Sequence, residues 1–383
     1  MDVPDRASTV IIGGGVMGTS IAFHLAEAGV ADIVLVEADQ LGSGSTSKAA
    51  GGVRLQFSDA LNIELALRSM HAFEHFGERP GGDISLRQVG YLMLLTEAAD
   101  VETFISSVEL QNRMGVPSRM LTAAEAGALA PLAGIDDVLA ASFCPRDGHA
   151  DTGAVVRGYA AAARRLGVRI LTGAPVISIE RDGERITRVV TAHGAIATET
   201  VVCAAGPWSG AIGALAGVDL PVVPVRRPVW YTEPIADLPP NHPFTIDFAT
   251  GFYFHEEGPG LLFGMADPHQ PPGFDVELRS DWLEVVAGVA AHRAPRLADV
   301  GIAGGWSGFY ETTPDHNAVI GCAGDLPRFF YATGFSGHGF LQGPAVGEVV
   351  RDLVLDRAPV VDVSALSAQR FVAAQARPEH NII

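Results

Sequence analysis

The feature of this sequence that most constrains its fold is a glycine-rich turn between a hydrophobic strand and a helix. The turn follows the hydrophobic run 9–12 and fits the pattern G-x-G-x-x-G with Gly13, Gly15 and Gly18. Gly13 permits the tight turn, Gly15 lets the backbone approach a pyrophosphate, and Gly18 lets the following amphipathic helix, to about residue 28, pack close to the strand. The N-terminus of that helix offers free N–H groups and the positive end of its dipole to phosphates. The turn therefore predicts a βαβ unit that binds a nucleotide.

The next hydrophobic run ends in an acidic residue, which strengthens this interpretation. Glu37 lies 19 positions after Gly18, where a carboxylate accepts hydrogen bonds from ribose hydroxyl groups. A glycine pattern alone also occurs in ordinary βαβ units. Strand, turn, helix, strand and acidic residue together predict a dinucleotide site. These residues leave open which dinucleotide is bound.

Length and charge limit the classes of protein to which the chain can belong. Its 383 residues exceed the roughly 250–300 at which single cores stop growing, so two domains, or one domain with a large insertion, are expected. The formal net charge of −18 disfavours nucleic acid and anionic membranes as partners. No apolar run approaches the roughly 20 residues of a membrane span. The N-terminal residues also lack the pattern of a signal peptide, so a cytoplasmic location is expected.

The cysteines argue against a disulfide framework or a zinc site. Cys144, Cys203 and Cys322 are far apart in the sequence and form no C-x-x-C pair, so each is expected to be a small buried hydrophobe. The histidines other than the site candidates below show no metal-ligand spacing. No metal is therefore expected.

The rest of the chain alternates between helical and strand patterns. Apolar residues at helical spacing predict helices near residues 58–77, 97–114, 122–130, 152–166, 278–291 and 343–356. Strands are expected near residues 89–95, 169–171, 175–179, 185–192, 195–198, 200–203 and 328–332. Residues 221–265 are strand-like and interrupted by prolines, which is typical of a mostly antiparallel sheet.

Several further motifs resemble those of one enzyme family. They are Gly44-Ser45-Thr46-Ser47 leading to Gly51-Gly52-Val53-Arg54, Asp147-Gly148-x-x-Asp151, Ala204-Ala205-Gly206-Pro207-Trp208, Tyr310-x-x-Thr313-Pro314-Asp315 and Gly334-Phe335-Ser336-Gly337-His338-Gly339. With the first turn and Glu37, the chain resembles flavin-dependent oxidoreductases of the D-amino-acid oxidase type. The branches that look most similar are sarcosine oxidase, the β-subunits of heteromeric sarcosine oxidase and proline dehydrogenase, and glycine oxidase. The resemblance runs from Val10 to about Val354, and the last two motifs are specific to the family.

The resemblance implies that the dinucleotide is FAD, and the residues agree. NAD needs one Rossmann unit, which would leave the Ser/Thr-rich loop and the late loop 334–339 unexplained. FAD is long, and a glycine-rich loop that enters a helix at about residue 343 can direct N–H groups at the flavin, where negative charge develops on reduction. The expected cofactor-binding residues are Gly13, Gly15, Val16, Met17, Gly18, Glu37, Ala38, Ser45, Thr46, Ser47, Ala50, Gly51, Gly52, Val176, Ala204, Ala205, Gly206, Trp208, Gly308, Gly334, Ser336, Gly337, His338, Gly339, Phe340 and Leu341.

The resemblance also implies an α/β fold with interleaved domains. A Rossmann-type FAD-binding domain is expected over residues 1–80, 145–220 and 305–383. A substrate domain, a mostly antiparallel β-sheet with helices, is expected over residues 81–144 and 221–304.

The sequence departs from the family where sarcosine oxidases bind the flavin covalently and activate oxygen. Monomeric sarcosine oxidases carry a flavin-linking cysteine two residues before the tyrosine of the Tyr-x-x-Thr-Pro-Asp motif. Gly308 stands there, so FAD is expected to be noncovalent. Two lysines of those enzymes are replaced by Met265 and Leu341, and Lys48 is the only lysine in the chain. These departures favour a dehydrogenase, or an oxidase that activates oxygen differently.

Five residues are candidates for catalysis and substrate binding near the flavin. Arg54 is expected to clamp a substrate carboxylate with two hydrogen bonds, with a structural ion pair as the alternative. Tyr253 and His255 alternate with phenylalanines on one strand, so their rings share a face that either lines the cavity or is half-exposed. Tyr310 is expected to cover the flavin or to touch FAD. His338 lies in the flavin loop, where it would donate to a flavin oxygen or bias substrate protonation.

Four other residues are weaker candidates. Arg226 and Arg227 are alternative carboxylate anchors, although solvation at the surface is favoured for both. Met265 and Trp230 are expected either as apolar cavity walls or as part of the core.

The family resemblance implies oxidation of a C–N bond in a small amino acid or N-alkyl amino acid. A neutral amine would give a hydride to flavin N5, and the imine would then be hydrolysed. One alternative is an FAD-dependent 2-hydroxy-acid dehydrogenase of the same fold. A second is a flavoprotein subunit of a heteromeric amino-acid dehydrogenase, and a third is a non-catalytic nucleotide sensor. A homo-oligomer or a partner subunit is left open.

Overall fold

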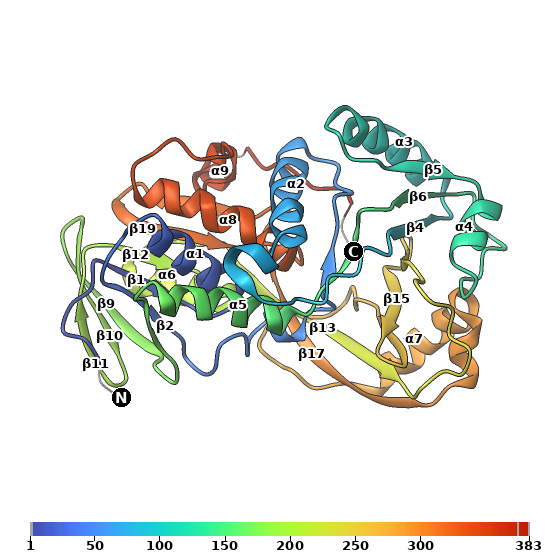
Figure 1. The fold of residues 1–383 in the computed structure, drawn as a ribbon, viewed down its shortest axis with the longest axis horizontal. Coiled ribbons are helices and arrows are strands. Elements are labelled where there is room, and N and C mark those ends of the chain that lie inside the picture. Colours follow the sequence, from blue (N-terminus) through green and yellow to red (C-terminus); the bar gives the residue numbers. More distant parts are fainter. Residues whose placement is uncertain (1–2, 374, 382–383) are drawn as a thin grey trace.

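The computed structural model describes residues 3–373 and 375–381. The chain forms two parts, each built on one large β-sheet with helices packed against it (Figure 1). One sheet is mainly parallel and the other mainly antiparallel. This arrangement confirms the predicted α/β fold class.

The first sheet has six strands in the order β18-β19-β12-β1-β2-β8. Their bounds are β1 Thr9–Ile12, β2 Ile33–Val36, β8 Arg169–Leu171, β12 Val201–Cys203, β18 Val319–Ala323 and β19 Leu326–Thr333. All pairs are parallel except β18 with β19. The strands β1, β2 and β12 are short β-branched runs and are fully buried, as expected for parallel strands covered on both faces.

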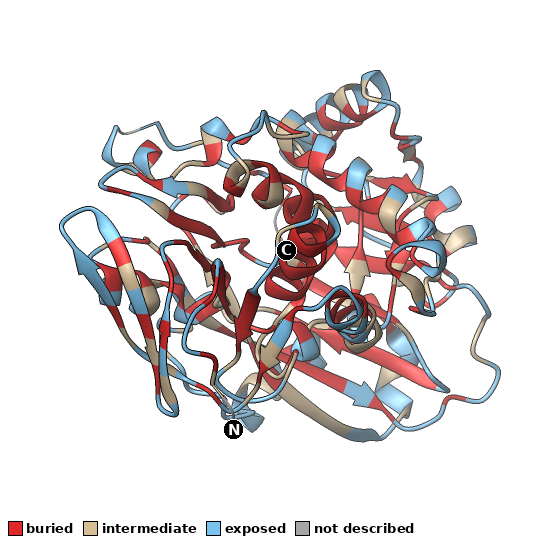
Figure 2. Ribbon diagram, turned by 60° about the vertical axis from the view of Figure 1, so that its left-hand side comes forward, coloured by how far each residue is buried: buried red, intermediate tan, exposed pale blue. Residues whose placement is uncertain are grey.

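Helices pack around this sheet and bring distant segments of the chain together. They are α1 Val16–Glu27, α2 Ala60–Glu74, α5 Thr152–Arg165, α6 Ser209–Ala216, α8 Gly339–Val354 and α9 Gln369–Val372. In α8, 13 of the 16 residues are buried. Figure 2 shows buried residues concentrated in the interior helices and strands. Gly347 of α8 allows α1 to approach, since a Cβ atom there would lie 2.2 Å from the Oγ atom of Ser20. The first and last long helices of the chain therefore form one layer.

The second sheet has eight strands in the order β17-β13-β16-β15-β14-β4-β6-β5. Their bounds are β4 Tyr91–Leu95, β5 Arg119–Leu121, β6 Ala140–Cys144, β13 Val223–Thr232, β14 Phe244–Asp247, β15 Phe252–Glu257, β16 Gly260–Gly264 and β17 Ile302–Thr312. Only the pair β14 and β4 is parallel among these described strands.

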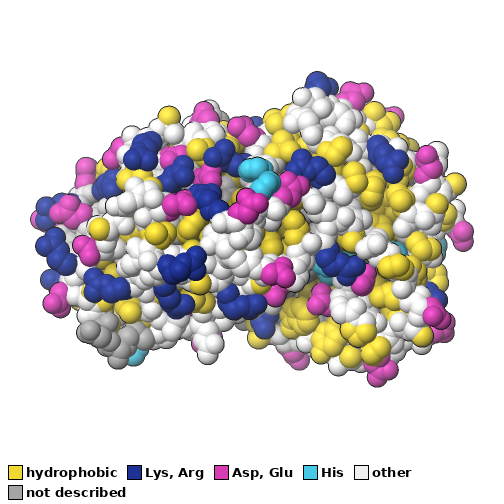
Figure 3. Space-filling model, viewed as in Figure 1, with side chains coloured by type: hydrophobic (Ala, Val, Ile, Leu, Met, Phe, Trp, Pro, Cys, Tyr) yellow, Lys and Arg dark blue, Asp and Glu magenta, His cyan; other side chains and the backbone are white. Residues whose placement is uncertain are grey.

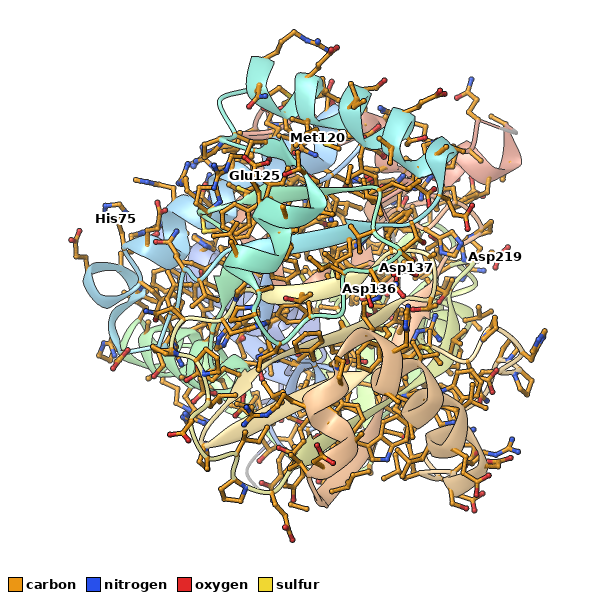
Figure 4. The ribbon with its side chains drawn as sticks, turned by 90° about the vertical axis from the view of Figure 1, so that its right-hand side faces the viewer. His75, Met120, Glu125, Asp136, Asp137 and Asp219 are labelled. Atoms are coloured by element: carbon orange, nitrogen blue, oxygen red, sulfur yellow. The ribbon has the colours of Figure 1, made fainter. Side chains whose placement is uncertain are left out.

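The helices α3 Ala98–Arg113, α4 Ala123–Leu129 and α7 Ser280–Arg293 belong to this second part. Arg293, at the end of α7, is buried and donates to Asp137 from NH1 at 2.9 Å and from NH2 at 3.1 Å. Figure 4 shows Asp137 beside this helix. The guanidinium group lowers the pKa of the Asp137 carboxyl to about 2. This pair joins α7 to the loop that precedes β6.

The smaller elements complete the path of the chain. A three-stranded sheet contains β9 Val176–Asp182, β10 Arg185–Thr191 and β11 Gly194–Ala197, and a two-stranded one contains β3 Gly52–Val53 and β7 Gly148–His149. Short helical turns lie at η1 Thr46–Lys48, η2 Gly77–Gly81, η3 Gly206–Trp208, η4 Pro295–Asp299 and η5 Ser364–Leu366.

The final long helix begins earlier than its sequence pattern indicated. The structure starts α8 at Gly339, not near residue 343, and includes Pro344 in the helix. The late glycine-rich loop therefore leads directly into the helix. The predicted domain boundaries stay a prediction, and β17 runs across the one between residues 304 and 305.

Two surface observations complete the description. On the face shown in Figure 3, basic and acidic side chains are interspersed. Among the described residues, no helix combines the length and the apolar character needed to cross a membrane.

Candidate active site

A cavity of about 570 Å³ lies at the carboxyl ends of the parallel strands β1, β2 and β12. The predicted cofactor-binding residues that line it are Gly13, Gly15, Val16, Met17, Glu37, Ala38, Ser45, Thr46, Val176, Ala204, Ala205, Gly206, Trp208, Gly308, Gly337, Gly339 and Phe340. Ligands of open parallel sheets bind at this edge of the sheet. We call this space the first cavity.

The glycine-rich turn at one end of the first cavity has no room for side chains. The backbone of Gly13 has φ +112°, and a Cβ atom there would lie 2.2 Å from the carbonyl oxygen of Ala204. A Cβ atom on Gly18 would lie 1.8 Å from the carbonyl oxygen of Gly13. Gly18 therefore acts in helix packing and does not line the cavity, as its predicted role implied. The turn leaves the N-terminus of α1 facing the cavity, where a phosphate group fits.

Glu37 follows β2 and holds the same turn from the other side. Its carboxylate accepts from the backbone N–H of Gly14 at 2.6 Å and of Asp39 at 2.8 Å. These two bonds fix the carboxylate at the wall of the first cavity. A carboxylate fixed in this way can still accept from the hydroxyl groups of a ribose.

The serine- and threonine-rich loop is attached to β17. The Ser45 hydroxyl donates to the Phe309 carbonyl at 2.8 Å, and the indole N–H of Trp306 donates to the Lys48 carbonyl at 2.9 Å. A Cβ atom on Gly308 would lie 2.6 Å from Cβ of Lys48. The glycine at 308 therefore allows the loop to lie against the strand along the first cavity.

A second cavity of about 110 Å³ adjoins the first one. The two share the lining residues Lys48, Ala49, Arg227, Tyr310, Gly337 and Phe340. The second cavity is also lined by Arg54, Tyr91, Phe244, Tyr253, Met265 and His338. No aspartate or glutamate is among its described lining residues. In a chain of net charge −18, this cavity is lined by two arginines and a lysine without a carboxylate.

Arg54 is buried beside the second cavity and is already hydrogen-bonded. Its NH1 donates to the Gln56 carbonyl, and its NH2 donates to the Asn381 carbonyl at 2.7 Å. The NH2 group also lies 3.0 Å from Nε2 of His338. Burial lowers the pKa of Arg54 from its ordinary value. The guanidinium group is thus held by three groups of the protein.

His338 precedes α8 and is buried beside Arg54. Burial, and then the nearby charge of Arg54, lowers the pKa of His338 well below its ordinary value, so its ring is neutral. Because an arginine can only donate, Nε2 of His338 is the acceptor in their contact. The edge of the ring also packs on Phe57, with 5.0 Å between the ring centroids.

Three tyrosines give the second cavity an aromatic wall. Tyr91 stacks on Phe244 with 4.3 Å between ring centroids, and Tyr253 stacks on the same phenylalanine at 5.6 Å. Tyr310 lies at the junction of the two cavities. Burial raises the pKa of Tyr91 and of Tyr253 above the ordinary value, so both hydroxyl groups stay protonated near neutral pH.

Comparison with known proteins identifies the family. The model of the family described as DAO, FAD dependent oxidoreductase, matches residues 8–353. The chain belongs to this family. Its cofactor is therefore FAD, and the predicted family membership is confirmed.

Individual relatives agree with this assignment. The chain is 30% identical to mouse mitochondrial dimethylglycine dehydrogenase, and the match covers 96% of this chain but 44% of that protein. The chain thus spans less than half the length of this relative. The structure of L-proline dehydrogenase from P. horikoshii is similar with a TM-score of 0.92 and 33% identity, covering 98% of this chain and 100% of that one. Glycine oxidase from Geobacillus kaustophilus has a TM-score of 0.86 and 27% identity, covering 96% and 99%.

The shape and donors of the first cavity fit FAD. Glu37 suits the ribose, and the N-terminus of α1 suits the pyrophosphate. Gly339 and Phe340, at the start of α8, line the same cavity, so a second helix N-terminus is available to the cofactor. The N–H groups of a first helical turn have no partners within their helix and can stabilise negative charge. The FAD contacts of the individual residues stay predictions.

Some predicted cofactor-binding residues of this DAO family member lie elsewhere. Ala50, Gly51, Gly52, Ser336, His338 and Leu341 line the second cavity and not the first. Ser47 and Gly334 line neither of the two. Gly334 instead has φ +71° and lies against Thr313. A Cβ atom on Gly334 would lie 2.4 Å from the Thr313 side chain, so only glycine fits there. Gly334 therefore shapes the loop and lines neither cavity.

Of the predicted catalytic residues, Arg54, Tyr253, Tyr310 and His338 line the second cavity, and His255 does not. His255 is completely buried, stacks on Phe244 at 4.5 Å and lies 4.8 Å from the ring of His149. The strand β7, which carries His149, covers this end of β15. Tyr253 and His255 share a face of β15, but Tyr253 lines the second cavity and His255 lies in the core.

The sequence did not single out Tyr91 or Phe244, and the surface position favoured for both Arg226 and Arg227 is wrong. Tyr91 and Phe244 lie in strands without a family motif. Arg227 lines both cavities, whereas Arg226 is buried and paired with Asp275 at 2.8 Å. Strand alternation places neighbouring side chains on opposite faces, so the two arginines lie in different surroundings.

Two buried carboxyl groups near the site also have altered acidity. Burial raises the pKa of Glu311, which lines the first cavity, to about 7. Burial likewise raises the pKa of Asp147 to about 7. Asp147 accepts from the backbone N–H of Leu55 at 2.8 Å and from the Gln56 amide at 3.1 Å. It thereby positions the loop that carries Arg54.

One group of side chains has metal-ligand spacing, although the histidines other than the site candidates were expected to show none. His71, Glu74 and His75 place ligand atoms within 4.8 Å of one another at the exposed C-terminal end of α2, where His75 follows the last helical residue. Figure 4 shows His75 pointing out of the molecule. The Glu74 carboxylate already accepts from Arg146 at 2.9 Å and 3.0 Å in a surface ion pair, and none of the three side chains lines either cavity.

Proposed function

We propose that this protein oxidises a C–N bond of a small amino acid or N-alkyl amino acid. The observation that carries the proposal is the second cavity, which is small, adjoins the first cavity, and has cationic and tyrosine walls without a carboxylate among its described residues. Such a cavity favours an anionic ligand over a cationic one. The names of the relatives support the proposal, because dimethylglycine, L-proline and glycine are all amino acids.

FAD supplies the hydride acceptor, and the protein provides orientation and electrostatics. Arg54, Arg227 and Lys48 favour a substrate carboxylate and disfavour an ammonium group in the same space. The substrate amine is therefore bound in its neutral form, with a lone pair available to the carbon–nitrogen bond. Because the amine is already neutral, no carboxylate base is needed in the second cavity.

The tyrosines and the neutral His338 supply hydrogen bonds without adding negative charge. The hydroxyl groups of Tyr91 and Tyr253 can donate to substrate oxygen atoms. His338 has its Nε2 occupied by Arg54 and acts through the position of that arginine. Close packing of Tyr91, Phe244 and Tyr253 leaves room for a small substrate only.

The test is anaerobic bleaching of the protein-bound flavin by a panel of D-, L- and N-methyl amino acids and their 2-hydroxy-acid counterparts. The proposal predicts bleaching by at least one amino acid, followed by recovery of the yellow colour with an electron acceptor. Bleaching by 2-hydroxy acids alone would replace it with the hydroxy-acid alternative. No bleaching by any amine would contradict it.

Admission of air after bleaching then separates an oxidase from a dehydrogenase. The replacement of the family lysines by Met265 and Leu341 favours slow reoxidation by oxygen. A cytoplasmic location, and a homo-oligomer or partner subunit, stay predictions. Inactivity of the pure chain, with activity in a copurified complex, would favour the heteromeric alternative.

A further inference from the structure

Arg227 differs from the other arginines near the site in what surrounds its guanidinium group. It lies in β13, next to Arg226. The guanidinium of Arg226 is held by Asp275, by Gln270 and by the Glu277 carbonyl. Arg227 points to the opposite face of the strand, where it lines both cavities.

The donors of Arg227 are largely unused. Its NH1 donates to the carbonyl of Arg226 at 3.0 Å, and its buried Nε has no hydrogen-bond partner among the described residues. No carboxylate oxygen of the described residues lies within ion-pair distance of it, although Asp267 attracts it from further away. Burial lowers the pKa of Arg227 from its ordinary value. A half-buried cation without a carboxylate partner offers a place where an anion can bind.

The ring of Tyr310 lies against the guanidinium group of Arg227. The guanidinium carbon of Arg227 lies 4.7 Å from the centroid of the Tyr310 ring. The ring face stabilises the cation and fixes the plane of its donors. A planar fork of donors held in this way matches the two oxygen atoms of a carboxylate.

We propose that Arg227 binds the carboxylate of the amino-acid substrate at the junction of the two cavities. This inference rests on the proposed function and names the group that would orient the substrate. Since Arg227 lines both cavities, a carboxylate held there keeps the adjacent C–N bond beside the space of the flavin. A carboxylate bound deep in the second cavity would instead place the C–N bond further from the first cavity.

Arg54, the anchor predicted from the sequence, has a different role in this arrangement. Its donors already bind Gln56, Asn381 and His338, so a substrate would have to displace bonds within the protein. Arg54 is then a positioning residue. It holds His338 and the segment near Asn381 in place and contributes positive charge to the second cavity.

The experiment titrates small carboxylates, acetate and pyrrole-2-carboxylate, into the FAD-containing protein and follows the visible flavin spectrum. The variants are Arg227→Met, which removes the charge, and Arg227→Lys, which keeps it. Arg226→Lys, one residue away on the same strand, is the matched control. Removal of a charge-assisted carboxylate contact is expected to weaken carboxylate binding by about 10- to 100-fold in Arg227→Met. The lysine variant should recover part of that loss.

A second readout separates the anchor from a flavin contact. Arg227→Met should keep its FAD, and the substitution should slow bleaching by amino acids more than bleaching by the corresponding amines without a carboxylate. The amino-acid concentration that gives half-maximal bleaching should be higher in Arg227→Met than in the unaltered protein. Equal carboxylate affinity in the unaltered protein and Arg227→Met would overturn the inference, as would loss of FAD from the variant. If no amino acid bleaches even the unaltered protein, the proposed function fails, while the carboxylate titration still reports on Arg227.

Discussion

Glu311 allows a quantitative test, because it is a carboxyl group buried in the wall of the first cavity. Its oxygen atoms accept from the Thr333 hydroxyl and from the Phe335 N–H, each at 3.3 Å. These long bonds do not offset the loss of water, so burial raises its pKa from 4.5 to about 7. The perturbation is Glu311→Gln, which keeps the shape of the side chain and removes its titration.

The sign of the effect follows from the raised pKa. The folded protein holds the proton of Glu311 more tightly than the unfolded chain, so this contribution to stability is fully present below about pH 4.5 and is lost as the pH rises through about 7. At 1.36 kcal/mol for each pH unit, the loss is on the order of 3 kcal/mol. Because glutamine does not titrate, Glu311→Gln should not lose this free energy of unfolding and should become more stable than the unaltered protein as the pH rises over this range.

The assay compares the Tm of the FAD-bound protein and Glu311→Gln from pH 4.5 to 8. The difference in Tm should grow with pH and level off above pH 7, by several degrees in total. Asp147 titrates in the same range but is present in both proteins, so it cancels. Glu64→Gln, at an exposed position of α2, controls for the loss of one carboxylate. A difference that stays constant, or that shrinks with rising pH, would refute the reasoning.

Three further predictions concern packing, an ion pair and oxygen. Gly18→Ala should reduce FAD content severely, because its Cβ atom would lie 1.8 Å from the Gly13 carbonyl oxygen; flavin absorbance per protein measures this. Arg370→Met should cost about 3–5 kcal/mol in thermal or denaturant unfolding, because it leaves Asp315 buried without the guanidinium 2.8 Å away. Lys48→Met should slow reoxidation of the reduced protein by air several-fold, because a cation lining both cavities stabilises negative charge on oxygen; an unchanged rate would exclude that role.

The sequence predicted best what local backbone chemistry determines. The turn at Gly13–Gly18 requires glycine for reasons visible in the pattern alone, and the structure shows the clashes that side chains would cause there. The parallel strands were visible as short apolar β-branched runs. The family motifs brought Ser45, Gly206 and Gly337 to one cavity, although they are far apart in the sequence.

The second cavity could not be predicted in the same detail, because its walls come from strand pairing between distant segments. Tyr91 reaches the cavity through the pairing of β4 with β14, and no motif marks it. His255 was misplaced because the remote strand β7 covers it. The choice between Arg226 and Arg227 depends on which face of β13 meets the cavities, and adjacent arginines carry no signal for that choice.

The most direct measurement of the central claim is the product balance of one anaerobic half-reaction. The FAD-containing protein is mixed with an acyclic amino acid that bleaches it, quenched, and assayed for carbonyl compound and for released amine or ammonia. Oxidation of a C–N bond predicts one carbonyl product and one amine or ammonia for each flavin reduced. Flavin reduction without release of amine or ammonia would contradict the account.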